Sequence, residues 1–504
     1  MRVLISILLF NQLIFSANIL SNCILDPNTR TFERFQFTFP ERIESEHFIV
    51  HFTTSNADSQ FVNEQWLNLQ CNFGYAQSVI ELAEYALAIF MEADWEMMPP
   101  DCDEGITDEE SPNHCNNFGG NALYDIYLAN DAVGLVAPEN PYPVEPYIGG
   151  YTSFMQVTPL GNDHTFVPDW SVHVIAHELH HAIQIRYGTS VSGEPGNYAY
   201  NGWLYEQTST YMENVIFPES YHFLIMMGNC NITSPLTYPE ISIDSSVDIY
   251  QYRSALWQKF LVEAYGDSTI NRLIWEGFGL ETATGNPVNM FPIYESALQT
   301  VTNGVTTLGD AYEDYALWRY FTGSRSRPGE FFMQAASYCT ANLLAIEETS
   351  TTFPSEKGGA RLVKLLPYET NLVLASSAYD NLLVQHISFS EEDEILMSSI
   401  EVNGEESFFQ LNNPAGDNHA LLITSEYTAE PGEEIEFTLS NTVPFIEGDI
   451  TGDSMVNVQD VIVQINIILH QIDPTEYQWL AADLDENNVV DVLDVILLVN
   501  LILG

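Results

Sequence analysis

The stretch His177-Glu178-Leu179-His180-His181 constrains this chain more than any other, because it places two imidazoles and a carboxylate where a helix can hold one metal ion. Residues four apart lie one above the other on a helix face, so His177 and His181 can point a ring nitrogen at a single zinc ion. Glu178 then falls beside that ion, where it can take a proton from a bound water whose pKa the metal lowers to roughly 7. The segment is therefore predicted to be a buried helix that holds a metal.

The surrounding residues favour one helix from Ser171 to Tyr187, followed by Gly188 where a helix C-cap belongs. Its apolar positions form a broad face, made of Val172, Ile175, Ala176, Leu179, Ala182, Ile183 and Ile185. Two alternatives stay open from this pattern alone. One is a core helix whose histidines are only hydrogen-bonded, and the other is a site in which His180 competes as a ligand.

A catalytic zinc ion needs a third protein ligand and keeps an open position for water. The segment 201–213 supplies two carboxylates, Glu206 and Glu213, on a second apolar helix. Either of them can complete the site.

The H-E-x-x-H pattern followed by Trp203-x-x-Glu206 resembles the gluzincins, zinc metalloproteases in which a Glu on the next helix is the third ligand. It is similar in particular to secreted bacterial metalloproteases that carry W-x-x-E-G-x-A-x-x-x-E after the histidines. This resemblance implies that Glu206 binds zinc and that Glu213 supports the ligands from behind. Gln207 and Ser209 stand where the family prefers Gly and Ala, and we expect neither to touch the metal.

The resemblance covers residues 45–290, with strong motifs only between 170 and 215. The segments 47–52 and 124–128 alternate like strands, and such strands commonly form the sheet above a zincin active site. The resemblance thus implies an α+β zincin-like protease domain, which we assign to residues 23–358.

Tyr252 is a candidate catalytic residue because it precedes the expected helix at 260–266, beyond the third ligand. A tyrosine there can donate a hydrogen bond to the oxyanion of a tetrahedral intermediate. The alternative is an aromatic residue of the core.

A pattern of oxygen-bearing residues occurs twice near the C-terminus, 34 residues apart. The residues occupy positions 1, 3, 5, 9 and 12 of an EF-hand-like calcium loop, and position 7 supplies a backbone carbonyl. The expected ligands are Asp449, Thr451, Asp453, Met455, Asn457 and Asp460 in the first loop, and Asp483, Asp485, Asn487, Val489, Asp491 and Asp494 in the second. Because the repeat stays in register, it predicts two calcium ions rather than two solvated acidic turns.

The duplicated loop-helix unit at 447–504 resembles a type I dockerin, the module that docks an extracellular enzyme onto a cohesin domain. The resemblance implies a small all-α calcium-binding domain whose partner is a cohesin-bearing scaffold or cell-surface protein. The two apolar helices that follow the loops, at 461–469 and 495–503, are expected to pack on each other. Loop position 6, normally Gly, is Ser454 in the first copy and Asn488 in the second, which favours weaker calcium binding in the first loop.

The charge balance limits the possible partners. The chain has 70 acidic and 14 basic residues and a formal net charge of -56, which excludes nucleic acid and anionic membranes. Residues 1–22, with an apolar run after Met1-Arg2, indicate a secretory signal peptide, and attachment of a lipid at Cys23 is the alternative. We expect a secreted protein that is extracellular or associated with the cell surface.

The six cysteines fit an oxidising compartment, and their spacing favours one local disulfide between Cys102 and Cys115. That bridge would tether the acidic loop 103–110, which either lies in solvent or holds another calcium ion.

Residues 359–444 change character, with short strands at regular spacing and turn residues between them. This pattern is typical of an all-β sandwich, which we expect as an accessory domain.

These features predict a multidomain, secreted zinc endopeptidase that is docked through a calcium-dependent dockerin. In the expected mechanism His177, His181 and Glu206 hold zinc, and Glu178 acts as general base and returns the proton to the leaving amine. The alternative is a non-catalytic docking or adhesive component of an extracellular polysaccharide-degrading assembly.

Overall fold

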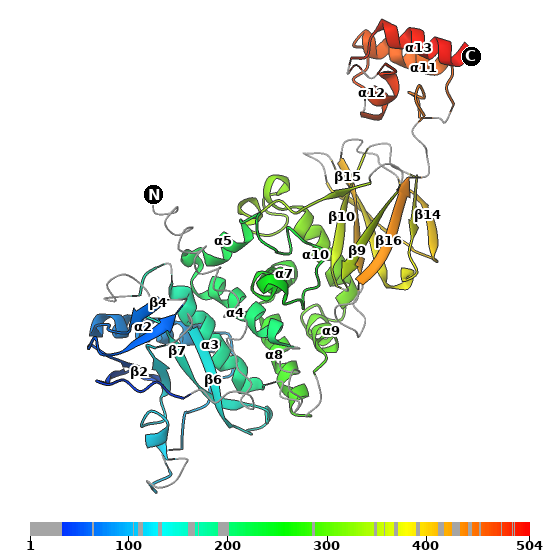
Figure 1. Ribbon diagram of the computed structural model, residues 1–504. Coiled ribbons are helices and arrows are strands. Elements are labelled where there is room, and N and C mark those ends of the chain that lie inside the picture. The colour runs from blue at the N-terminus through cyan, green and yellow to red at the C-terminus, as the bar shows by residue number, and fades with distance from the viewer. Residues whose placement is uncertain are drawn as a thin grey trace. The chain divides into compact units, whose positions relative to one another are not determined.

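The computed structural model places the chain in two compact units (Figure 1). The first comprises the residues up to Thr237, 243–308 and 321–340, and the second comprises 238–242, 309–320 and the residues from 341 onward. The structure describes residues 33–503 except 63–64, 104, 109–113, 130–133, 160–166, 170, 190–200, 285–287, 347–349, 357, 367–370, 390–393, 412–417, 426–433, 442–445, 453–454, 475, 486 and 488. The predicted signal peptide and Cys23 lie outside the described residues.

The first unit contains a five-stranded sheet. Its strands, in spatial order, are β1 (Glu41–Glu44), β2 (Phe48–Phe52), β5 (Tyr124–Tyr127), β7 (Tyr151–Val157) and β6 (Gly134–Pro141). β2, β5 and β7 are parallel, whereas β1 and β6 run antiparallel at the two edges. The predicted strands at 47–52 and 124–128 are confirmed as β2 and β5, which are almost entirely buried, as parallel strands usually are.

Two long helices pack on this sheet. α2 (Phe73–Glu92) contacts β2, α3 (Val172–Tyr187) contacts β6 and β7, and the two helices contact each other, so they cover the same face. A small hairpin of β3 (Ser59–Val62) and β4 (Gln65–Asn68) precedes α2. α2 begins where Asn72 caps the backbone N–H of Tyr75. α3 matches the predicted helix and ends before Gly188, whose amide donates to Gln184.

A group of helices follows in the same unit: α4 (Gly202–Ile216), α5 (His222–Met227), α6 (Tyr250–Arg253), α7 (Ala255–Tyr265), α8 (Thr269–Thr282) and α9 (Met290–Val301). Short 3-10 turns accompany them and the sheet, namely η2 (Cys115–Asn117), η4 (Pro218–Ser220), η5 (Val247–Ile249), η6 (Gly323–Arg325) and η7 (Ala335–Ser337). α4 is the centre of the group, since it contacts α3, α5, α6 and α7. Trp257 and Trp275 are fully buried among these helices and supply much of the apolar area of the core.

Two disulfides cross-link the first unit. The predicted bridge between Cys102 and Cys115 is confirmed. A second bridge joins Cys230 to Cys339, 109 residues apart in sequence. No local spacing signals such a pair, and only the fold brings its Cα atoms to 5.3 Å. The remaining described cysteine, Cys71, is a buried thiol.

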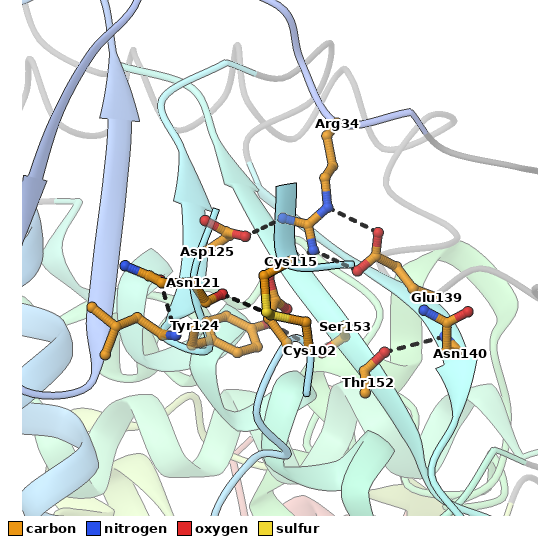
Figure 2. A network of polar contacts seen from close by, with 12 residues as sticks. Arg34, Cys102, Cys115, Asn121, Tyr124, Asp125, Glu139, Asn140, Thr152 and Ser153 are labelled. Atoms are coloured by element: carbon orange, nitrogen blue, oxygen red, sulfur yellow. Dashed lines mark hydrogen bonds and ion pairs between the residues drawn. A yellow bond between two sulfur atoms is a disulfide. The ribbon is translucent and has the colours of Figure 1, made fainter. Parts of the chain in front are cut away.

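A buried ion network fastens the segment before β1 to the sheet (Figure 2). The guanidinium of Arg34 donates to Asp101 on the disulfide-linked loop, Asp125 on β5 and Glu139 on β6. The distances are 2.7 Å to Asp101 and 2.6 and 3.0 Å to the two oxygens of Glu139. One guanidinium thus pairs with carboxyl groups from three segments, and the edge strand β6 is tied to the rest of the sheet.

The second unit contains two sheets. One has the order β13 (Leu396–Ile400), β12 (Leu382–Phe389), β15 (Asn418–Ser425), β10 (Ala360–Leu365) and β8 (Leu344–Ala345), and the other has the order β14 (Glu406–Gln410), β11 (Asn371–Ala375), β16 (Glu434–Asn441) and β9 (Ser350–Glu356). Both sheets contribute to one apolar cluster that includes Val363, Ile423, Leu374 and Phe437. The unit also contains most of α10 (Leu308–Tyr320) and the turn η8 (Tyr379–Asn381).

The expected boundary between residues 358 and 359 falls within these paired sheets. β8 and β9 precede it, and β9 pairs with β16 from Ser350 to Glu356. The sequence of β9, STTFPSE, does not predict a strand, because it contains a proline and has no apolar alternation.

The C-terminal part of the second unit is helical, with α11 (Val458–Ile468), α12 (Glu476–Ala482) and α13 (Val492–Leu503). α11 and α13 contact each other as expected, and Ile467 and Leu498 lie in their shared core. Both helices begin three residues earlier than predicted. For α11 the reason is a capping box. The side chain of Asn457 accepts a hydrogen bond from the backbone of Asp460, and the side chain of Asp460 accepts one from the backbone N–H of Asn457. Among the described residues, no helix combines the length and apolar character needed to cross a membrane.

Candidate metal centre

The histidine motif lies where α3 packs against α4. His173, His177 and His181 are spaced four apart on α3, so they form a row along one side of the helix. Glu206 and Glu213 are seven apart on α4 and form the facing row. His177, His181 and both glutamates are buried. The 3.6-residue period of both helices therefore brings imidazoles and carboxylates together in the protein interior.

Three side chains present their donor atoms to one point. The Nε2 atoms of His177 and His181 lie 3.0 Å apart, and Oε2 of Glu206 lies 3.1 Å from the first and 3.4 Å from the second. Ligands at about 2.0–2.1 Å from a tetrahedral zinc ion must lie roughly 3.3 Å from one another. The triangle formed by His177, His181 and Glu206 therefore fits zinc in both donor type and size.

The other ring nitrogens of the two histidines are held by acceptors. Nδ1 of His177 lies 2.7 Å from Oε1 of Glu213, and Nδ1 of His181 lies 2.7 Å from Oε1 of Gln184. When each Nδ1 carries the proton and donates it to these oxygens, each Nε2 presents its lone pair to the metal position. Glu213 thus lies behind His177, in the place that the gluzincin resemblance implied.

The two positions that depart from the family pattern have different surroundings. Gln207 is buried in a polar network in which it donates to the carbonyl of Ile243 and to Ser254, away from the triangle. Ser209 lies closer than expected, because its hydroxyl is 3.1 Å from Nδ1 of His181 and 3.0 Å from Nδ1 of His180. The Ser209 hydroxyl thus helps to orient a proposed ligand.

His180 does not join the triangle. Its ring stacks on Phe90, with centroids 5.2 Å apart, and meets the edge of Trp95 at 4.9 Å. Burial lowers the pKa of His180 well below its usual value, and the charges of His181 and His177 lower it further. A neutral ring in an aromatic pocket explains this residue better than a role as competing ligand.

Glu178 is buried beside the triangle. Its Oε2 atom has no hydrogen-bond partner among the described residues, and Gly134 at the start of β6 packs directly against its side chain. Burial raises the pKa of Glu178 to about 8, although the nearby His177 opposes that shift. A buried polar atom without a partner is costly, so this oxygen is available to a water or a ligand.

The other two carboxylates remain ionised. Burial alone would raise the pKa of Glu206, but His181 and His177 outweigh it and bring the pKa to about 2. Burial likewise opposes ionisation of Glu213, and the charges of His222 and His173 with the hydrogen bonds from His177 and His222 lower its pKa below the usual range.

Tyr252 lies on α6 with its ring stacked on that of His177, at a centroid distance of 5.9 Å and an interplanar angle of 22°. Two consecutive residues before α6, Asp248 and Ile249, adopt the left-handed conformation with φ of 48° and 58°. That conformation is costly for a β-branched residue and is often found beside functional sites. This strained turn immediately precedes the helix that carries Tyr252.

The calcium loops have matching geometry. In the first, the carboxylate of Asp460 accepts from the backbone amides of Thr451 and Asn457, both at 2.8 Å. In the second, the carboxylate of Asp494 accepts from the equivalent amides of Asp485 and Asp491, at 3.2 and 2.8 Å.

One carboxylate oxygen each from Asp483, Asp485 and Asp494 lies within 4.8 Å of the others. The side chains at position 7, Met455 and Val489, are 61% and 55% exposed, which leaves their carbonyls as the expected ligands. Two backbone amides also bind loop carboxylates, that of Asn487 to Asp483 and that of Gly452 to Asp449. Asp453 lies outside the described residues.

Two families match parts of this chain. Residues 165–294, which include every residue of the candidate metal centre except Gly134, match a family of unknown function, DUF6055. Residues 447–503 match the dockerin type I domain. No curated protein matches the chain.

The C-terminal match means that the chain ends in a dockerin, which binds calcium and docks onto a cohesin-bearing scaffold. Dockerins occur in extracellular cellulosome components.

Proposed function

We propose that the first unit is a zinc-dependent endopeptidase, delivered to a cohesin-bearing scaffold by the C-terminal dockerin. The single observation that supports the zinc site best is the triangle formed by Nε2 of His177, Nε2 of His181 and Oε2 of Glu206, with sides of 3.0, 3.1 and 3.4 Å. The Oε2 atom of Glu178 beside it, which has no hydrogen-bond partner in the part of the chain that the structure describes, supports a hydrolytic reaction rather than a purely structural ion. Structural zinc sites usually have four protein ligands, whereas the described residues supply three here.

In the proposed mechanism, His177, His181 and Glu206 would hold the zinc ion, which when bound would act as a Lewis acid toward the scissile carbonyl and lower the pKa of water. The positive charge of a bound zinc ion would favour the ionised form of Glu178. In that form Glu178 accepts the proton of the attacking water at its carboxylate and delivers that proton to the leaving amine nitrogen. Glu213 and Gln184 keep the two histidine rings in the required orientation through Nδ1. Tyr252, which stacks on His177, donates its hydroxyl proton in a hydrogen bond to the oxygen that becomes negative in the transition state.

The edge strand β6 provides a surface for an extended substrate. β6 is the last strand of its sheet among the described residues, and its first residue, Gly134, contacts Glu178. The backbone groups on the outer side of an edge strand can pair with an added peptide strand. A peptide bound in this way would pass directly over the general base.

The dockerin supports a second candidate, in which the chain is a non-catalytic docking or adhesive component of a polysaccharide-degrading assembly. This candidate needs no zinc chemistry at all. The two proposals differ in whether a zinc-loaded chain cleaves peptide bonds, and one set of measurements separates them.

The test combines metal analysis with cleavage of a denatured protein, with and without a zinc chelator. Glu178→Gln should keep its zinc, because Glu178 is not a ligand, but lose about 10²–10⁴-fold in turnover. Glu206→Ala should lose the zinc ion of the triangle and, with it, the activity. The matched control Glu213→Ala should retain a metal site with an affinity or rate about 10–100-fold lower.

Three outcomes would contradict the endopeptidase proposal. Full activity of Glu178→Gln would exclude Glu178 as the general base. Wild-type zinc content and activity in Glu206→Ala, with activity lost in Glu213→Ala, would exclude Glu206 as the third ligand and favour Glu213. A fully zinc-loaded wild-type chain that cleaves no protein or peptide would favour the docking component.

A further inference from the structure

A second group of metal-binding side chains lies beside the candidate metal centre. His173 precedes His177 by one turn on α3, Glu213 lies near the end of α4, and His222 is the first residue of α5. One ring nitrogen of His173, one of His222 and one oxygen of Glu213 lie within 4.8 Å of one another. None of the three belongs to the triangle formed by His177, His181 and Glu206.

The two oxygens of Glu213 have different neighbours. Oε1 lies 2.7 Å from Nδ1 of His177, and Oε2 binds Nδ1 of His222. Orienting His177 requires only the first oxygen. The second oxygen and the pair of imidazoles around it are therefore not explained by support of the first site.

The side chains of His173 and His222 pack against each other. The rings of His173 and His222 lie face to face, with centroids 4.0 Å apart and an interplanar angle of 16°. A metal ion bound by an imidazole lies near the plane of its ring, so one of the two rings must turn when both bind one ion.

Burial and access both suit a metal ion. The side chain of Glu213 is only 3% exposed, and a buried carboxylate is normally paired or bound to a metal. His222 is 16% exposed, which gives an ion a route from solvent. Donor atoms now up to 4.8 Å apart must close to roughly 3.3 Å around zinc, and a partly exposed side chain at a helix start can make that movement.

We propose that His173, Glu213 and His222 form a second binding site for a divalent transition metal such as zinc. Two imidazoles and one carboxylate suit zinc and its neighbours in the transition series, whereas calcium and magnesium prefer all-oxygen ligands. Three protein ligands leave at least one coordination position for water.

Glu213 connects the two sites. A cation at Oε2 withdraws negative charge from the carboxylate that accepts the hydrogen bond from His177, so each ion lowers the affinity for the other. Such coupling is reciprocal, and each metal should weaken the binding of the other by the same factor.

The test uses the full chain in millimolar calcium, which keeps the dockerin loops filled, and zinc alone as the probe. Equilibrium dialysis followed by elemental analysis should give two zinc ions per chain. His222→Ala and His181→Ala should each retain one ion, lost from a different site, and the double variant should bind none. His470→Asn, which replaces an exposed histidine in the dockerin, is the matched control and should still bind two.

The outcomes separate this site from the proposed catalytic one. One zinc in the wild type, retained by His222→Ala and lost by His181→Ala, would overturn the second site and leave the first intact. One zinc retained by His181→Ala and lost by His222→Ala would overturn the catalytic site instead. The wild-type stoichiometry needs no variant, so a single ion per chain refutes a two-metal centre even where a variant fails to fold.

Discussion

Replacing Gly134 by Ala tests whether Glu178 must stay where it lies. A Cβ atom at position 134 would come within 2.3 Å of Oε1 of Glu178 and within 2.6 Å of its Cδ and Cγ atoms. Ordinary contacts of a Cβ atom begin near 3.4 Å. The carboxylate, or the start of β6, must therefore move by about 1 Å in a close-packed interior.

The expected effect is on activity more than on stability. A displacement of about 1 Å in a catalytic group costs roughly 10²-fold in kcat/KM. Overpacking at one methyl group lowers the free energy of unfolding by about 1–3 kcal/mol. Zinc content should not change, because the three nearest atoms to the new Cβ all belong to Glu178 and none to a proposed ligand.

The measurements are kcat/KM for cleavage of a denatured protein, zinc content and the thermal unfolding curve. Gly404→Ala is the matched control, since a Cβ there meets nothing within 4 Å and should leave all three values unchanged. A folded, zinc-loaded Gly134→Ala variant with wild-type kcat/KM would refute the inference that Glu178 acts from its observed position.

Three further predictions concern the other parts of the chain. The excised segment 447–504 should be unstructured in chelator and helical in millimolar calcium, because its loop carboxylates repel without a cation; a circular dichroism spectrum indifferent to chelator would contradict this. Arg34→Met should lower the free energy of unfolding of the first unit by about 3–5 kcal/mol, because it leaves buried carboxylates without a cation, and denaturant unfolding measures this. Burial, together with the charge of His419, lowers the pKa of His386 from 6.5 to about 4 in the folded chain. Between pH 4 and 6.5 the unfolded chain therefore binds more protons than the folded chain. Stability of the second unit should therefore fall by roughly 1–2 kcal/mol on acidification from pH 6.5 to 4, and melting curves of His386→Phe should show a smaller loss.

Local spacing was enough to predict several features of this protein. The i, i+4 spacing of His177 and His181 predicts the helix that carries them, since a helical period is a property of a few consecutive residues. The calcium loops and the disulfide between Cys102 and Cys115 could be recognised for the same reason, because all their partners lie within a short stretch of chain. The resemblance also pointed to Glu206 and Glu213, and both face the histidines across the contact between α3 and α4.

Other features depend on which distant segments meet, and the sequence by itself does not determine these. Gly134 lies against Glu178 because an edge strand crosses α3, and His222 reaches Glu213 because a turn returns α5 to the end of α4. The bridge between Cys230 and Cys339 and the pairing of β9 with β16 likewise join segments far apart in the chain. Burial and packing decide such contacts only when the whole unit is folded, and no local period or spacing records them.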